Sequence, residues 1–74
     1  MRIKANDYSP AEIIKIIREW SGLTQEGFGK MLGRSRHSIQ SMELGRKNVF
    51  LHTLLEIADK QGLSITIEKK SKTL

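Results

Sequence analysis

Hydrogen-bonding side chains dominate one short stretch of the sequence, residues 36–41. Five of its six residues can donate or accept hydrogen bonds through the side chain: Arg36, His37, Ser38, Gln40 and Ser41. The only acidic residue between Lys30 and Lys47 is Glu43. A helix that presents donors with almost no negative charge is suited to the major groove of DNA, where base edges offer many acceptors.

The sequence offers little other chemistry. It has no cysteine, which excludes disulfides, thiolate metal sites and a cysteine nucleophile. His37 and His52 lack ligand-spaced partners for a metal. Gly22 and Gly27 have the separation of a phosphate-binding loop, but Phe28 stands where lysine is required. A domain of 74 residues leaves little room for a shielded pocket, so we expect no enzyme, no metal and no cofactor.

Two short helices joined by a tight turn must position the donors. Thr24 can cap a helix over residues 25–32, because its hydroxyl can accept from a first-turn amide. Gly33 can adopt the left-handed conformation that ends this helix. Ser35 can cap the next helix, over residues 36–44. The apolar residues of the two helices recur at spacings of three and four: Phe28, Met31, Leu32, Ile39 and Met42.

Two longer helices are expected to flank this pair. Residues 9–12 read Ser-Pro-Ala-Glu, a strong start signal for a helix over residues 10–21. Ile14 and Ile17 of this helix are expected to face the helical core. Its other large apolar residues are expected to cover another element: Ile13, Ile16 and Trp20. A fourth helix is predicted over residues 50–61, with a poorly capped start.

The apolar period changes after the fourth helix. Ile65 and Ile67 alternate with polar residues, which predicts a strand over residues 64–69. Residues 1–5 also alternate, and a strand or a frayed terminus is expected there. A lone strand leaves its backbone unpaired, so we expect it to pair with residues 1–5 and with the same strand of a second chain. The residues assigned to this sheet and dimer contact are Ile3, Trp20, Ile65 and Ile67. The alternative is a dimer formed by the fourth helix.

Three ordered segments carry a family resemblance. They are G-L-T-Q from Gly22, L-G-x-S-x-x-x-I from Leu32 and M-E-x-G from Met42. The set resembles the helix-turn-helix of phage repressor and Cro-type regulators, the XRE family, over roughly residues 12–63. The resemblance implies a mainly α, four-helix, lambda-repressor-like domain within residues 1–74. With its C-terminal strand, the chain is similar to a subgroup of small regulators that includes many antitoxins of toxin–antitoxin pairs.

The resemblance implies a role for each polar residue. The helix over residues 36–44 becomes the recognition helix, whose N-terminal end reaches deepest into the groove. Arg36 can pair with guanine and Gln40 with adenine, while His37 and Ser38 are weaker base-reading candidates. The candidates for phosphate are Gln25, Arg34, Ser35, Ser41, Arg46 and Lys47.

Two further positions match the family. There, an arginine of the first helix commonly pairs with a glutamate near the end of the recognition helix, and Arg18 and Glu43 occupy these places. The pairing would explain a carboxylate so close to DNA phosphate. The alternative is two exposed charges. Gly27 and Gly29 depart from the family pattern: both weaken the helix, and Gly29 can allow close approach of the next helix.

Charge and hydropathy fit this interpretation. The net charge of +5 favours a polyanionic partner, although many small soluble domains are basic. No apolar run approaches the length of a membrane span and the N-terminus lacks a signal-peptide core, so a cytoplasmic protein without membrane contact is expected.

The leading hypothesis is a sequence-specific, double-stranded DNA-binding regulator, a repressor acting as a homodimer on a palindromic operator. A prophage regulator and an antitoxin with a toxin partner both fit. The competing hypothesis is a protein-interaction module that keeps the fold without DNA binding. Such a module would be expected to show apolar or acidic residues on the recognition helix.

Overall fold

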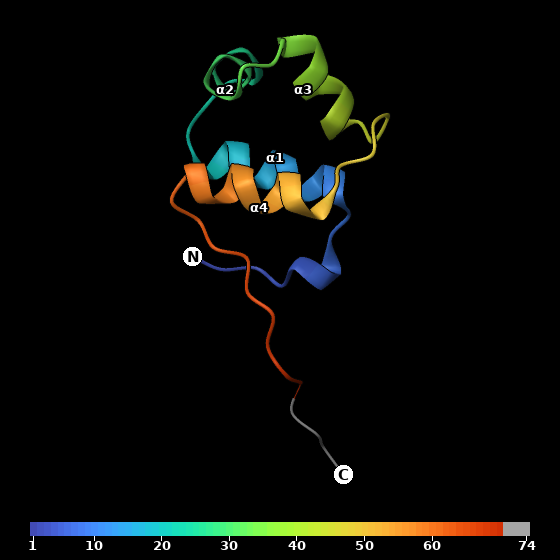
Figure 1. The fold of residues 1–74 in the computed structure, drawn as a ribbon, viewed down its shortest axis with the longest axis vertical. Helices are drawn as coiled ribbons and strands as arrows, with labels where there is room; N and C mark the ends of the chain where they lie inside the picture. The colour runs from blue at the N-terminus through green and yellow to red at the C-terminus, as the bar shows by residue number, and fades with distance from the viewer. Residues whose placement is uncertain (71–74) are drawn as a thin grey trace.

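The computed structural model describes residues 1–70 and is mainly helical. A turn of 3-10 helix precedes four α-helices: η1 (Ala5–Asp7), α1 (Pro10–Trp20), α2 (Gln25–Leu32), α3 (Arg36–Glu43) and α4 (Leu51–Lys60). The predicted and observed bounds of the four helices differ by at most one residue. Figure 1 shows α1 and α4 side by side across the middle of the molecule, with α2 and α3 on one side of them. The N-terminal segment and the end of the described chain lie on the other side.

Local side-chain caps explain where the helices begin. The Ser9 hydroxyl accepts from the Glu12 amide at 3.2 Å, and the Glu12 carboxylate accepts from the Ser9 amide at 2.9 Å. The bond from the Ser9 amide is the main reason why the pKa of Glu12 lies below its usual value. Thr24 and Ser35 cap α2 and α3, each accepting from the amide three residues later at 3.0 Å. Phe50 gives α4 no side-chain cap, so the weak start predicted there is confirmed.

One core joins all four helices. Ile14 and Ile17 of α1 are buried in it, as predicted. The remaining buried apolar side chains come from the other three helices: Phe28, Ile39, Met42, Leu54, Ile57 and Ala58. Burying one such side chain stabilises the fold by about 1.5–3 kcal/mol, so α2 and α3 are held on the α1–α4 layer by packing rather than by helix propensity.

The turn between α2 and α3 passes very close to Gly29. The Arg34 amide donates to the Gly29 carbonyl at 2.7 Å. A Cβ atom on Gly29 would lie 2.6 Å from the Arg34 carbonyl oxygen. The sequence-based expectation that Gly29 permits a close approach is therefore confirmed, and the approaching element is the turn that leads into α3.

Neither predicted strand is present within residues 1–70. Residues 1–4 lead directly into η1, and residues 63–70 run as extended chain without a paired neighbour. The reason is competition for the apolar side chains. Ile65, like Ile13, packs against the helical core instead of a sheet, while Ile67 is left 93% exposed. The prediction of a sheet between residues 1–5 and 64–69 of one chain is therefore wrong.

The residues assigned to cover that sheet have other surroundings. Ile3 and Ile16 are half-buried. Trp20 retains 36% of its exposure at the end of α1. Because residues 1–70 contain no strand, Trp20 has no sheet to cover in the single chain.

Candidate nucleic-acid interface

Helix α3 lies at one end of the molecule (Figure 1), and its outer surface presents polar side chains. Arg36, His37 and Gln40 are exposed on it, whereas Ile39 and Met42 of the same helix are buried. The apolar residues thus fix the rotation of α3 and turn the donors outward. Three of the four candidate base-reading side chains share this accessible surface, and the fourth, Ser38, is half-buried beside it.

The loop after α3 returns to the same surface. Arg46 and Lys47 are exposed in this loop. The Lys47 ammonium donates to the Ser38 hydroxyl at 3.2 Å, which joins the loop to α3. A predicted phosphate-binding residue and a predicted base-reading residue therefore contact each other directly.

Ser41 does not belong to this surface. Only 7% of Ser41 is exposed, and its carbonyl accepts from the Arg46 amide at 3.0 Å. The chain folds back on the end of α3 at this point, so Ser41 faces the protein. The prediction that its hydroxyl holds phosphate conflicts with this burial.

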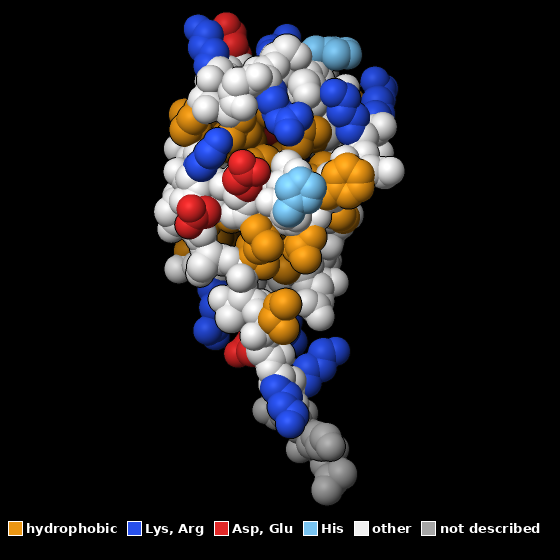
Figure 2. All heavy atoms as spheres, in the orientation of Figure 1, with side chains coloured by type: hydrophobic (Ala, Val, Ile, Leu, Met, Phe, Trp, Pro, Cys, Tyr) orange, Lys and Arg blue, Asp and Glu red, His pale blue; other side chains and the backbone are white. Residues whose placement is uncertain are grey.

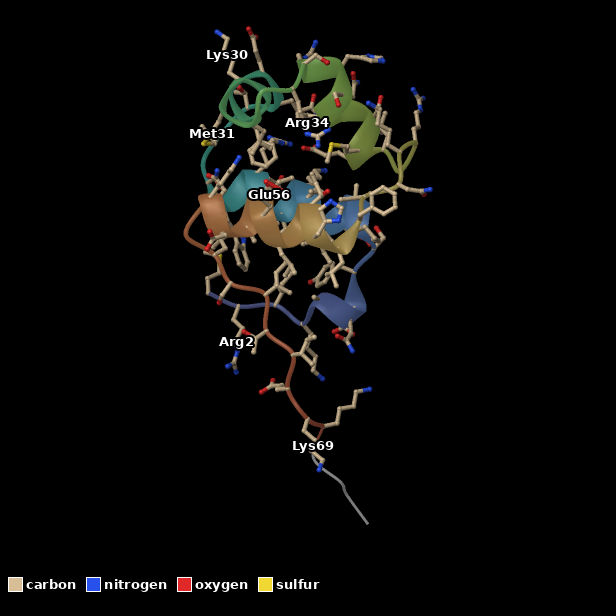
Figure 3. All side chains as sticks on the ribbon, in the orientation of Figure 1. Arg2, Lys30, Met31, Arg34, Glu56 and Lys69 are labelled. Carbon is tan, nitrogen blue, oxygen red and sulfur yellow. The ribbon has the colours of Figure 1, made fainter. Side chains whose placement is uncertain are left out.

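Two predicted phosphate-binding residues, Arg34 and Ser35, lie in the turn between α2 and α3 and have different surroundings. The Ser35 hydroxyl accepts from the Ser38 amide, so it is already used as the α3 cap. Arg34 is exposed and lines a shallow cleft that runs to the outer side of α4. Figure 3 shows Arg34 between α3 and α4, with Glu56 below it. Arg34 therefore lies at the flank of the exposed α3 surface rather than at its centre.

Glu43, the last residue of α3, is turned inward and shared by two other helices. Its two carboxylate oxygens accept from the Arg18 guanidinium, Oε2 from Nε at 2.7 Å and Oε1 from Nη2 at 3.1 Å. The Arg18 and Glu43 side chains are 15% and 5% exposed. This bond to the Glu43 carboxylate is the main cause of the raised pKa of Arg18. Arg18 also donates to the Leu23 carbonyl at 2.9 Å, which fixes the segment between α1 and α2.

Gln25 completes this network. Its Nε2 donates to Glu43 Oε1 at 3.2 Å. Gln25 is the first residue of α2, where first-turn amides favour an anion. An amide nitrogen carries two protons, and the bond to Glu43 uses one of them.

The sequence did not reveal the Gln25–Glu43 and Lys47–Ser38 bonds. Their partners lie 18 and 9 residues apart in the chain and on different elements. No local periodicity or cap links such pairs. The packing of α2 against α3 brings the first pair together, and the path of the loop after α3 brings the second pair together.

Positively charged side chains predominate at this end of the molecule on the face that Figure 2 draws. Figure 2 shows Lys and Arg side chains around the α2–α3 end. Glu43 adds little negative charge to the α3 surface because Arg18 neutralises it. A polyanion that approaches α3 therefore meets donors and cations with little opposing charge.

Metal-binding clusters and membrane-spanning helices are both absent from the described residues. Residues 1–70 contain no group of three or more His, Cys, Asp or Glu side chains able to hold a metal ion. No helix within the same residues has the length and apolarity to cross a bilayer.

Comparison with known proteins gives one finding. Residues 11–66 match the family described as "Helix-turn-helix domain". The matched segment contains α2, the turn, α3, α4 and nearly all of α1. No curated protein and no solved structure matches the chain.

Proposed function

Because the chain belongs to the family of helix-turn-helix domains, we propose that it is a sequence-specific, double-stranded DNA-binding transcriptional regulator with α3 as its recognition helix. One observation carries the proposal. Arg36, His37 and Gln40 are exposed together on α3, and the helix's only carboxylate is withdrawn into the Arg18 pair.

The proposed contacts fall into two classes. Arg36 and Gln40 read base edges, because guanidinium and carboxamide groups can bond in pairs to guanine and adenine. His37 and Ser38 make secondary contacts. The phosphate contacts that fix the position of α3 come from the residues around it: Gln25, Arg46 and Lys47. Arg34 adds a longer-range cationic contact from the flank.

The finer proposal is a cytoplasmic repressor of the phage repressor and Cro type. Such a protein acts as a homodimer, because two recognition helices about 34–36 Å apart fit consecutive major grooves on one side of the duplex. The operator is then an approximate palindrome. The antitoxin alternative, with its toxin partner, depended on a C-terminal strand that residues 64–70 do not form in the single chain, so the repressor is preferred.

Selection of bound duplexes from a random pool tests this proposal. The expected result is one enriched motif with two inverted half-sites centred about one helical turn apart. Enrichment without a motif would show sequence-independent binding. Absence of enrichment would support the protein-interaction module instead, and either result would contradict the proposal.

A further inference from the structure

The outer side of α4 and the residue before it carry three large apolar side chains that the core does not use. Phe50, Leu51 and Leu55 are 66%, 61% and 42% exposed. We call these three residues the α4 apolar surface. Leu51 and Leu55 are four residues apart and therefore neighbours on one side of the helix. Figure 2 shows apolar side chains gathered over α4, on the side that faces the viewer.

Neither the fold nor the proposed DNA contacts account for this surface. The core takes Leu54, Ile57 and Ala58 from α4, which leaves Leu51 and Leu55 on a different part of the helix. The proposed DNA-contacting residues lie on α3, at the start of α2, in the loop after α3 and, for Arg34, in the turn between α2 and α3. A contiguous exposed apolar surface beside polar residues is typical of a protein–protein contact.

Charge opposes contact with a second copy of the chain less at α4 than elsewhere on the chain. The chain has thirteen Lys and Arg against eight Asp and Glu. Within α4 this balance is reversed: Lys60 is its only Lys or Arg, against Glu56 and Asp59. Two copies repel each other over most of their surfaces. This repulsion is weakest where α4 meets α4, because Glu56, Asp59 and Lys60 leave each copy of the helix with only a small net charge.

The position of the surface also fits a two-fold contact. In Figure 1 the recognition helix lies at one end of the molecule, and α4 lies on the side facing the viewer. A two-fold axis that runs beside α4 toward the α3 end brings the two α4 helices together. Both recognition helices then face the same way, as one DNA duplex requires. An interface of this kind places the same residues on both sides.

We propose that the α4 apolar surface is the homodimer interface, formed by Phe50, Leu51 and Leu55 of two copies of the chain. The inference deepens the proposed function by naming the contact that a dimeric regulator needs. It takes up the alternative left open by the sequence, a dimer formed by the fourth helix, in place of a dimer formed by residues 64–69. In this dimer, Phe50 and His52, whose rings stack with centroids 5.9 Å apart, form an edge of the contact.

Sedimentation of the free protein tests the proposal. The wild type is expected to dimerise, and the Leu51→Glu/Leu55→Glu double variant to remain monomeric, because four carboxylates would meet in the contact. Met31→Glu is the matched control, since Met31 is 45% exposed but lies on α2. It is expected to dimerise like the wild type. A monomeric wild type, or a double variant that dimerises equally well, would overturn the proposal.

A second test avoids added charge and so guards against loss of folding. The chain contains no cysteine, so Leu51→Cys and Leu55→Cys each provide a single thiol. Mild oxidation is expected to join two copies through one or both of these positions, and not through Met31→Cys. Cross-linking that is fastest through Met31→Cys would contradict the α4 contact.

Both tests omit DNA, so their failure is distinct from failure of the proposed function. A chain that dimerises through α4 and selects no DNA motif refutes only the DNA proposal. A chain that selects a palindrome and dimerises elsewhere refutes only the α4 contact.

Discussion

Gln25 donates a hydrogen bond to Glu43, with Nε2 and Oε1 3.2 Å apart, and this bond ties the start of α2 to the end of α3. The same carboxylate holds Arg18 of α1. Three helices therefore meet at one side chain. In the proposed complex this network fixes the direction of a phosphate contact relative to the base-reading surface of α3, before any DNA is bound.

The first prediction concerns the stability of the Arg18–Glu43 pair. Arg18→Met or Glu43→Leu alone is expected to lower the free energy of unfolding by about 3 kcal/mol, because each leaves a nearly buried charge without its partner. The double variant, Arg18→Met/Glu43→Leu, is expected to lose less than the sum of the two single variants. Urea unfolding of all four proteins measures the coupling. Additive losses would show that the pair does not stabilise the fold.

The second prediction separates the two roles of Gln25. Gln25→Ala removes one hydrogen bond to Glu43, so the expected loss of stability is about 1 kcal/mol. Its effect on DNA is expected to be similar for a selected site and an unrelated duplex, because a phosphate contact carries no sequence information. Fluorescence anisotropy with both duplexes measures this. A loss confined to the selected site would show that Gln25 reads a base instead.

The third prediction concerns Lys47. Lys47→Ala is expected to weaken binding to all duplexes and to reduce the slope of log K against log salt by about 1, because one fewer counterion is released. Lys69→Ala is the control, since Lys69 lies near the end of the described chain, at the opposite end of the molecule from α2 and α3 (Figure 3). Equal slopes for wild type and Lys47→Ala would exclude a phosphate contact by this residue.

The fourth prediction compares two glycines of α2. Gly29→Ala is expected to destabilise the protein by about 1–3 kcal/mol, because its methyl group would crowd the Arg34 carbonyl and displace the turn. At Gly27 the nearest atom to an added Cβ is the Thr24 hydroxyl oxygen, at 3.3 Å. Gly27→Ala is therefore expected to be neutral or to stabilise by up to about 1 kcal/mol. The melting temperatures of both variants are compared with that of the wild type. A higher melting temperature for Gly29→Ala would contradict the close approach of the turn to Gly29.

Local signals in the sequence were sufficient for the helices. Ser9, Thr24 and Ser35 each cap a helix that begins at the next residue, because a cap acts within three residues. The strand prediction failed for the opposite reason. Alternation at Ile65 and Ile67 describes a segment suited to pairing, but pairing needs a distant partner that the pattern does not specify.

The candidate DNA-contacting surface could be predicted from the sequence only in part, for the same reason. The exposure of Arg36 and Gln40 follows from the apolar period of α3, which the sequence contains. The burial of Ser41 does not, because it arises where the chain turns back after α3 and the Arg46 amide bonds to the Ser41 carbonyl. The inward position of Glu43 was expected from family resemblance, whereas its bond to Gln25 required the packed structure.

The central claim is that α3 reads bases through Arg36, and one comparison tests it most directly. The affinities of the wild type and Arg36→Ala are measured for the selected site and for a shuffled duplex of the same length and composition. The account predicts a loss of about 1–3 kcal/mol on the selected site, a much smaller loss on the shuffled duplex and relaxed preference at one base pair in each half-site. An equal loss on both duplexes, or unchanged affinity and selectivity, would contradict it.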